Sequence, residues 1–382
     1  MAQVNGHCDA QFQSVRDAFS KHILSGEEHG GSLAVNIDGR DVISLWGGYA
    51  DAARTKPWNE DTIVNIWANT KIVCALAMLK LVDRGLVSLN DRVAKFWPEF
   101  AANGKEKIEI RHLLSHSSGV AGWDHPMTLE AMCDIESSTA ELAKQAPWWE
   151  PGTASGYHCW TYGHLIGEVI RRVTGVRLKE FVANELCEPV GADLQIGIKE
   201  KDWGRVAELV PVPSLTDFPA WAPNSIPERV FNPLANPSFA NESIWRQAEL
   251  GSVNGHGNAQ ACTRLLSAWT LAGHGSDFVS KDTASLIFEE QVRGVDLFNG
   301  MYLRMGCGAM SLRGDGDTAV DQWLPAGRVC QWGGWGGSKH VMDLDRRLTF
   351  SYVMNKMRTE GPVTPLVREL LKETYKALGI EI

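Results

Sequence analysis

The sequence has no long apolar run and no basic cluster, and each absence argues against a class of protein. No stretch reaches the roughly 18 apolar residues that a membrane-spanning helix needs. The 382 residues carry a formal net charge of −9, and no Lys/Arg-rich run supplies the basic stripe of a nucleic-acid-binding protein. The N-terminal segment shows no basic region followed by an apolar one. We therefore expect a cytoplasmic protein with no membrane or nucleic-acid partner.

Closely spaced cysteines are also lacking. The eight cysteines lie far apart and form no C-x-x-C pair, so neither a disulfide framework nor a zinc site is indicated. We expect reduced, mostly buried thiols, with no metal and no cofactor. The composition, 44% hydrophobic and 22% charged, is that of a globular protein whose length allows one large unit or two joined lobes.

Strand-like segments occur near both ends of the chain, and helical patterns dominate between them. A helix is predicted around 12–23, followed by the strand-like runs SLAVNID and DVISLWGGYA with a turn at Gly39-Arg40. Strand signals return in MYLRMGCGAMSL, GRVCQW, KHVMDL and RLTFSYVMN, before a closing helix over 363–378. This order predicts one antiparallel sheet built from both chain ends.

The predicted fold class is therefore α/β (α+β), a sheet flanked by helices with a mainly helical lobe inserted. We place the sheet lobe at 1–60 and 255–382 and the helical lobe at 61–254, with a cleft between the lobes. Within the helical lobe, seven prolines break up the segment 210–245, which nevertheless keeps several aromatic residues. A long loop of this kind is usually functional, and its aromatics predict an ordered cover over part of the cleft.

Lys71 opens a strongly apolar helical segment, IVCALAMLKL, so its amine lies near a helix N-terminus and next to a desolvating environment. Both effects lower the pKa of a lysine. A lysine three residues after a serine can activate the hydroxyl, because one helical turn brings the two side chains together. Here that position is Ala68, which has no hydroxyl. Thr70 is no substitute, since it faces another side of the helix.

The segment 67–100, WANTKIVCALAMLKLVDRGLVSLNDRVAKFWPEF, resembles the nucleophile helix and following loop of class C β-lactamases and family VIII carboxylesterases. Both belong to the serine β-lactamase and penicillin-binding-protein superfamily. The family pattern continues in IRHLLSHSSGV, which is similar to its helix-and-turn segment and whose role we expect to be structural. The resemblance implies a β-lactamase-like fold, with the nucleophile at position 68 and Lys71 as its activating base.

Tyr157 occupies the position at which this family carries a tyrosine, after a Pro-Gly turn and before a long amphipathic helix. The resemblance implies that its phenolic oxygen acts as general base and then general acid, with the phenolate favoured by the nearby cation. β-Lactamases carry tyrosine-x-asparagine here, whereas this chain has Cys159 in place of the asparagine. His158 is not part of a Ser-His-Asp triad, because no G-x-S-x-G motif is present, and we expect it to make local hydrogen bonds.

The third motif is Trp332-Gly333-Gly334, which matches the tryptophan-x-glycine of family VIII carboxylesterases rather than the lysine-threonine-glycine of β-lactamases. The resemblance implies that the N–H groups of residue 68 and Trp335 stabilise an oxyanion. Tryptophan in place of lysine favours neutral or apolar acyl substrates over penicillins. We expect further pocket walls from other tryptophans, if the proline-rich segment folds over the cleft: Trp160, Trp221, Trp245 and Trp335.

These motifs predict a serine carboxylesterase that acts on a small-molecule ester through an acyl-enzyme, present here as an inactive variant. We favour a serine-to-alanine replacement at Ala68, because the rest of the apparatus persists. The alternatives are an acyltransferase similar to the lovastatin type, or a non-catalytic ligand-binding protein in which Ala68 is natural. A β-lactamase or D-aminopeptidase fits less well, because of the departures at Cys159 and Trp332.

Overall fold

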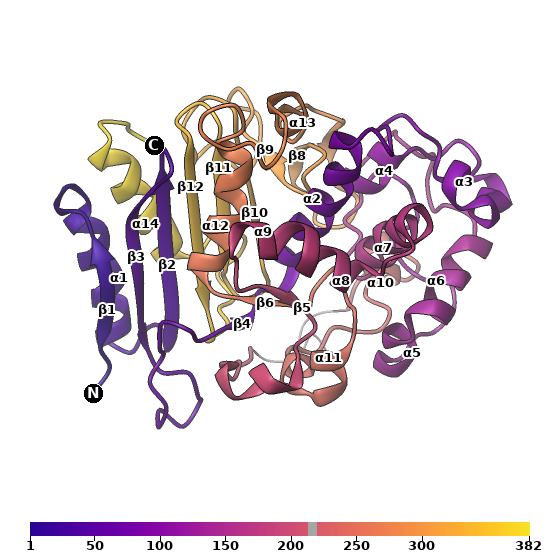
Figure 1. Ribbon diagram of the computed structural model, residues 1–382. Helices are drawn as coiled ribbons and strands as arrows, with labels where there is room; N and C mark the ends of the chain where they lie inside the picture. Colours follow the sequence, from indigo (N-terminus) through magenta and orange to yellow (C-terminus); the bar gives the residue numbers. More distant parts are fainter. Residues whose placement is uncertain (213–219) are drawn as a thin grey trace.

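The computed structural model describes residues 1–212 and 220–382, which contain one nine-stranded sheet covered by helices (Figure 1). Its order is β1-β3-β2-β12-β11-β10-β9-β8-β7, and every neighbouring pair is antiparallel. The strands are β1 (Val4–Cys8), β2 (Gly30–Ile37), β3 (Arg40–Gly48), β7 (Val292–Val295), β8 (Tyr302–Met305), β9 (Ser311–Leu312), β10 (Val329–Gly333), β11 (Lys339–Asp343) and β12 (Leu348–Met354).

The two ends of the chain meet in the middle of this sheet. Strand β12 pairs with β2, with Leu348 opposite Ile37 and Met354 opposite Gly31. The predicted antiparallel sheet from both ends is therefore confirmed. Strand β1, at the edge, was not predicted, because its sequence VNGHC contains asparagine and glycine, which are depleted in strands.

The hairpin turn between β2 and β3 lies one residue earlier than predicted. Asp38 and Gly39 have φ values of 52° and 83°, and Arg40 is already the first residue of β3. Positive φ at both central residues matches the twist of the two strands, and glycine adopts it without a steric penalty.

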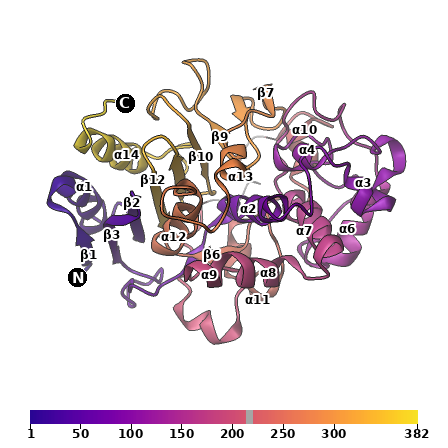
Figure 2. The ribbon, with the colours of Figure 1, turned by 45° about the horizontal axis from the view of Figure 1, so that its top comes forward.

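Helices cover both faces of the sheet (Figures 1 and 2). On one face lie α1 (Gln13–Leu24) and α14 (Pro365–Ala377), and the Tyr375 hydroxyl of α14 donates to Asp343 on β11 at 3.1 Å. On the other face lies α12 (Ala259–Thr270), whose first N–H donates to the Ser32 hydroxyl on β2 at 3.0 Å. The central strands β2, β11 and β12 are thus buried on both sides, whereas the edge strands β1 and β7 keep exposed residues.

Helix α2 (Thr70–Asp83) lies between the sheet and the group of helices on the other side of the molecule (Figure 2). Its residues are buried from Thr70 to Leu79, as expected of a helix that is apolar all round. The helical group comprises α3 (Val93–Phe96), α4 (Ile110–Leu114), α5 (Leu129–Cys133), α6 (Ile135–Lys144), α7 (Thr161–Thr174) and α8 (Leu178–Phe181).

The proline-rich segment contains only short elements where it is described. These are α10 (Ile226–Val230), a 3₁₀ helix (Pro237–Asn241) and α11 (Ser243–Gln247). Phe218, one of its aromatics, lies outside the described residues. A second, three-stranded sheet has the order β4 (Val64–Asn65), β6 (Gly255–Gly257) and β5 (Gln195–Ile196). The division into two lobes stays a prediction.

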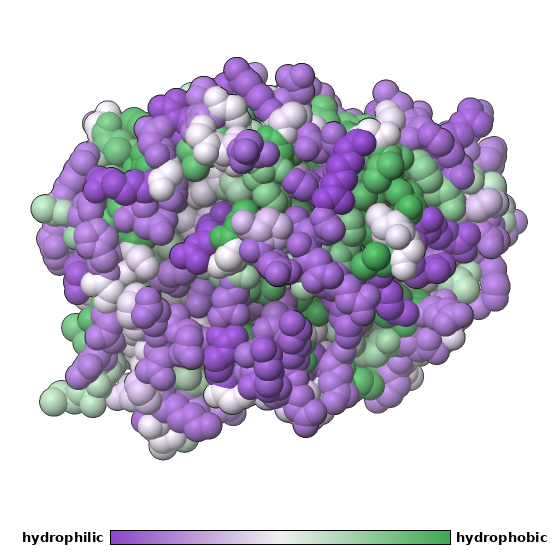
Figure 3. Space-filling model, in the orientation of Figure 1, coloured by the Kyte–Doolittle hydropathy of each residue, from purple (hydrophilic) through white to green (hydrophobic). Residues whose placement is uncertain are grey.

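The surface in Figure 3 is mainly hydrophilic, with scattered apolar patches. Among the residues that the structure describes, no helix combines the length and apolar character needed to cross a membrane.

Candidate active site

Position 68 lies on a strained turn at the start of α2. Ala68 is the middle residue of a short 3₁₀ helix (Trp67–Asn69), and Trp67 before it has a φ of 50°, unusual for a bulky side chain. The Trp67 ring packs edge-on against Trp245 and Trp335, with centroids 5.3 and 5.1 Å apart. This packing holds the strained residue in place. Such strain is common at functional sites.

Two neighbouring side chains tie this turn to the rest of the molecule. The Thr70 hydroxyl donates to the Trp67 carbonyl at 2.6 Å and accepts from the Gly255 N–H at 2.8 Å, and its side chain is fully buried. This arrangement agrees with the exclusion of Thr70 as a nucleophile. The Asn69 amide lies 3.0 Å from the Ser338 hydroxyl, which links the turn to the loop after β10.

Lys71 is fully buried and makes no ion pair among the described residues. Its Nζ donates to the carbonyls of Cys159 and Ser252, both at 2.9 Å, and lies 4.6 Å from the centroid of the Tyr157 ring. Desolvation by burial lowers the pKa of Lys71 from 10.5 to about 8. A substantial fraction of this amine is therefore neutral just above neutral pH and can accept a proton.

Tyr157 lies beside Lys71 with its ring held between aromatic residues. Its centroid is 5.5 Å from Trp332 and 5.5 Å from Phe298, and its N–H lies 3.4 Å from an Asp296 carboxylate oxygen. Burial raises the pKa of the Tyr157 phenol well above 10. Burial therefore favours the protonated phenol and opposes the phenolate expected from the nearby cation. The role of Tyr157 in proton transfer stays a prediction.

The loop after β10 approaches the turn at position 68 closely. A Cβ atom on Gly334 would lie 2.4 Å from the Ile66 carbonyl and 2.3 Å from the Ser338 hydroxyl, so only glycine fits. The β10–β11 ladder ends at Gly333, and the Gly334 N–H donates to the Ser338 carbonyl at 2.9 Å. Within the described residues, the N–H groups of Ala68 and Trp335 donate to no carbonyl. Both remain available, as an oxyanion site requires.

A cavity of about 440 Å³ opens at this point, and its walls are mainly apolar. Ala68, Tyr157 and the run from Trp332 to Trp335 all line it. The sequence motifs thus meet at one cavity. The reasoning from sequence missed several other lining residues, because nothing in the sequence shows that they face the cavity, although Trp67 and Gln331 adjoin the motifs: Trp67, Phe231, Phe298, Trp323, Gln331 and Lys339.

Of the four tryptophans predicted as pocket walls, two line the cavity and two do not. Trp160 and Trp335 line the cavity, and the Trp160 indole N–H is fixed on the Pro233 carbonyl at 3.0 Å. Trp221 does not line it but stacks 4.9 Å behind Phe231, which does. Trp245 is fully buried, and its indole N–H donates to Asn65. Trp245 therefore supports Trp67 instead of facing a ligand.

A serine–histidine pair lies next to the site but outside the cavity walls. The Ser118 hydroxyl is 2.7 Å from His158 Nε2, while His158 Nδ1 lies 2.6 Å from the Gly156 carbonyl. The His158 N–H donates to His116 Nδ1 at 3.0 Å. His158 thus makes the local hydrogen bonds that we expected. Ser118 is fully buried, so it is not placed to attack a ligand in the cavity.

Comparison with known proteins places these features in a family. The Beta-lactamase family profile matches residues 15–372. Esterase/beta-lactamase LipL of Mycobacterium tuberculosis is 31% identical over 296 residues, which cover 73% of this chain and 68% of LipL. ML-236A carboxylate methylbutanoyltransferase mlcH of Penicillium citrinum is 30% identical over 165 residues, 37% of this chain and 39% of mlcH.

Comparison with solved structures also identifies an esterase relative. A solved structure of a family VIII carboxylesterase superposes with a TM-score of 0.90 at 34% sequence identity, covering 98% of this chain and all of the other. The proteins to which this chain is similar thus include esterases and an acyltransferase. With its mixed α/β architecture and a profile match over nearly its whole length, the chain belongs to the beta-lactamase family.

Proposed function

We propose that this site, with a serine at position 68, hydrolyses a small-molecule carboxylic ester through an acyl-enzyme. One observation carries the proposal: Ala68, Tyr157 and Trp335 line the same cavity, and the buried Lys71 amine contacts Tyr157 from behind it. A nucleophile, an acid and an oxyanion donor would then line one cavity, with the base packed against the acid. The similarity to LipL and to the family VIII carboxylesterase supports the same chemistry.

Lys71 is the proposed base because of its place beside position 68, and its pKa of about 8 allows a neutral form near physiological pH. A hydroxyl at position 68 would lie one helical turn before it. The hydroxyl proton moves to the Lys71 amine as the oxygen attacks the ester carbonyl carbon. The negative charge that develops on the carbonyl oxygen is met by the N–H groups of residue 68 and Trp335.

Tyr157 is the proposed acid for the second half of this step. As the carbon–oxygen bond to the leaving alcohol breaks, the departing oxygen takes the phenolic proton, which the Lys71 ammonium replaces. Water then attacks the acyl-enzyme by the same route and releases the acid. In the chain with Ala68 no covalent bond can form, so we propose that it binds esters without turnover.

The walls of the cavity support an ester with apolar groups. Trp160, Trp332 and Trp335 present aromatic surface, and the Trp332 side chain puts no charge where β-lactamases carry the lysine of their motif. Apolar acyl or alcohol groups gain free energy by leaving water for such walls, about 25 cal/mol for each Å² buried.

Acyl transfer is the second candidate, supported by the similarity to mlcH. In that reaction an alcohol instead of water would attack the acyl-enzyme. The two reactions are separated by incubating the Ala68→Ser variant with an ester and an acceptor alcohol, followed by chromatography of the products. A new ester indicates transfer, and free acid alone indicates hydrolysis. A third candidate, a binding protein with a natural Ala68, requires that the variant form neither product.

We also propose a cytoplasmic location, supported by the cysteines. All eight lie among the described residues, and none of them forms a disulfide there. Thiols in this state suit a reducing compartment. Fractionation of the source cells with an antibody against the chain tests this, and recovery in an extracellular or periplasmic fraction would contradict it.

A further inference from the structure

A second buried lysine lines the same cavity and has no part in the proposed reaction. Lys339, the first residue of β11, is 2% exposed. Its Nζ donates to Gln331 Oε1 at 2.8 Å and to the Pro362 carbonyl at 2.6 Å. An ammonium has three N–H bonds. Among the described residues no oxygen or nitrogen accepts the third and no carboxylate pairs with this lysine, whose Nζ lies 4.9 Å from the centroid of the Trp323 ring.

Gly333 on the neighbouring strand makes room for this ammonium. The two residues are paired across β10 and β11, and a Cβ atom on Gly333 would lie 2.8 Å from Lys339 Nζ. The lysine can therefore lie against the strand that carries Trp332. A cation is thus present beside the motif after all, although it comes from the adjacent strand and not from the motif itself.

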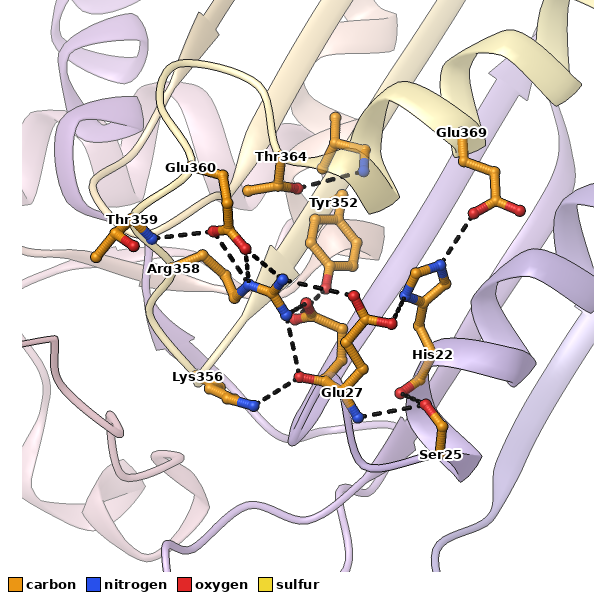
Figure 4. A network of polar contacts seen from close by, with 12 residues as sticks. His22, Ser25, Glu27, Tyr352, Lys356, Arg358, Thr359, Glu360, Thr364 and Glu369 are labelled. Atoms are coloured by element: carbon orange, nitrogen blue, oxygen red, sulfur yellow. Dashed lines mark hydrogen bonds and ion pairs between the residues drawn. The ribbon is translucent and has the colours of Figure 1, made fainter.

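The other cation of the cavity wall, Arg358, is already neutralised. Its guanidinium donates to Glu360 and to Glu28, and the Glu27 carboxylate lies 3.5 Å away (Figure 4). These carboxylates already supply the counter-charge of the arginine. Within the described part of the wall, Lys339 is the cationic residue that still lacks a counter-charge.

We infer that the cavity binds an ester with a carboxylate at the end of its acyl or alcohol part, and that Lys339 receives this carboxylate. The inference rests on the proposed function and adds one anionic end to an otherwise apolar ester. A buried ammonium without a counter-ion is unfavourable, and a bound carboxylate supplies both charge and the missing acceptor. Burial alone lowers the pKa of Lys339 to about 7, which agrees with the absence of a nearby anion.

The test uses the chain with Ala68, which holds esters without cleaving them. Isothermal titration measures the dissociation constants of two sets of probes. Monomethyl esters of dicarboxylic acids, from adipate to sebacate, carry the carboxylate on the acyl side. O-Acetyl hydroxy acids of similar length carry it on the alcohol side. Each probe is compared with the same molecule ending in a primary amide, which is similar in shape but uncharged.

We expect that in at least one set the carboxylate binds ten-fold or more tightly than its amide, since charge-assisted hydrogen bonds have about that effect. Lys339→Met should remove the preference. Gly333→Ala, whose methyl group would displace the ammonium, should reduce it. The matched control is Lys105→Met, because Lys105 is also buried and donates to the Ala102 and Ala143 carbonyls but does not line the cavity. That control should keep the full preference.

Equal binding of carboxylate and amide in both sets, or a preference that survives Lys339→Met in a folded variant, overturns the inference. Circular dichroism and the thermal midpoint of each variant establish folding, and Gly333→Ala gives an independent result if Lys339→Met does not fold. The proposed function is tested separately, by hydrolysis of neutral esters in the Ala68→Ser variant. Hydrolysis without carboxylate preference removes the inference alone, whereas no hydrolysis of any ester removes the proposed function.

Discussion

The unpaired Lys71 ammonium should destabilise the fold in a manner that depends on pH. A pKa of about 8 in the folded chain, against 10.5 as its ordinary value, disfavours the charged form by about 3 kcal/mol near pH 7. Between these two pKa values the unfolded chain binds more protons than the folded chain, so the free energy of unfolding rises with pH. By about pH 9.5 the penalty falls to about 1.4 kcal/mol, a change of about 2 kcal/mol.

The Lys71→Met substitution isolates this effect. The parent should gain about 2 kcal/mol of stability from about pH 7 to about pH 9.5, as its Lys71 loses its proton. The variant has no titrating group at position 71 and lacks this gain, so its stability relative to the parent should fall by about 2 kcal/mol over the same range. The substitution also leaves the Cys159 and Ser252 carbonyls without their donor, but that loss is the same at both pH values and cancels.

Urea denaturation followed by tryptophan fluorescence at the two pH values measures the difference. Lys107→Met, at an exposed lysine, is the control and should show no comparable change. A difference between Lys71→Met and the parent that stays constant within about 0.5 kcal/mol would refute the reasoning, because it would mean that folding does not lower the pKa of Lys71.

Three further predictions concern the Ala68→Ser background. In Gly334→Ala the added methyl group would collide with the Ile66 carbonyl. The substitution should lower the free energy of unfolding by about 1–3 kcal/mol in urea denaturation and reduce kcat/KM more than ten-fold. No change in either quantity would mean that the loop can shift freely. The value of kcat/KM for a neutral para-nitrophenyl ester should rise with pH and level off above about 8, since Lys71 must be neutral, and a flat profile through that range would contradict its role as base. Ser118→Ala should retain activity in the same assay, because Ser118 lies outside the cavity wall, and complete loss in a folded variant would contradict this purely local role.

Sequence patterns predicted the parts of the fold and site that depend on local order. The apolar run after Lys71 indicated a buried helix, and the position of this lysine at its start followed directly. Likewise, strand signals before Trp332 placed the motif at the end of β10. Both predictions needed only the pattern of neighbouring residues.

Tertiary packing decided the rest. Nothing in the sequence distinguishes Trp245, which lies in the core, from Trp160, which lines the cavity, because both are aromatic residues in apolar surroundings. The strain at Trp67 depends on partners far along the chain. The alternation of a strand indicates which residues share a face with Lys339, but it does not show that the cavity extends to that lysine.

The account depends most directly on position 68 and Lys71 acting together. The decisive measurement is the rate of ester hydrolysis by three chains: the one described here, Ala68→Ser, and Ala68→Ser combined with Lys71→Ala. We expect essentially no turnover in the first, a gain of about 10⁴-fold or more in the second, and loss of most of that gain in the third, because an unactivated serine is a weak nucleophile. Gain with serine but indifference to Lys71 would contradict the assigned base, and no gain in a folded Ala68→Ser chain across a broad panel of esters would contradict the enzyme itself.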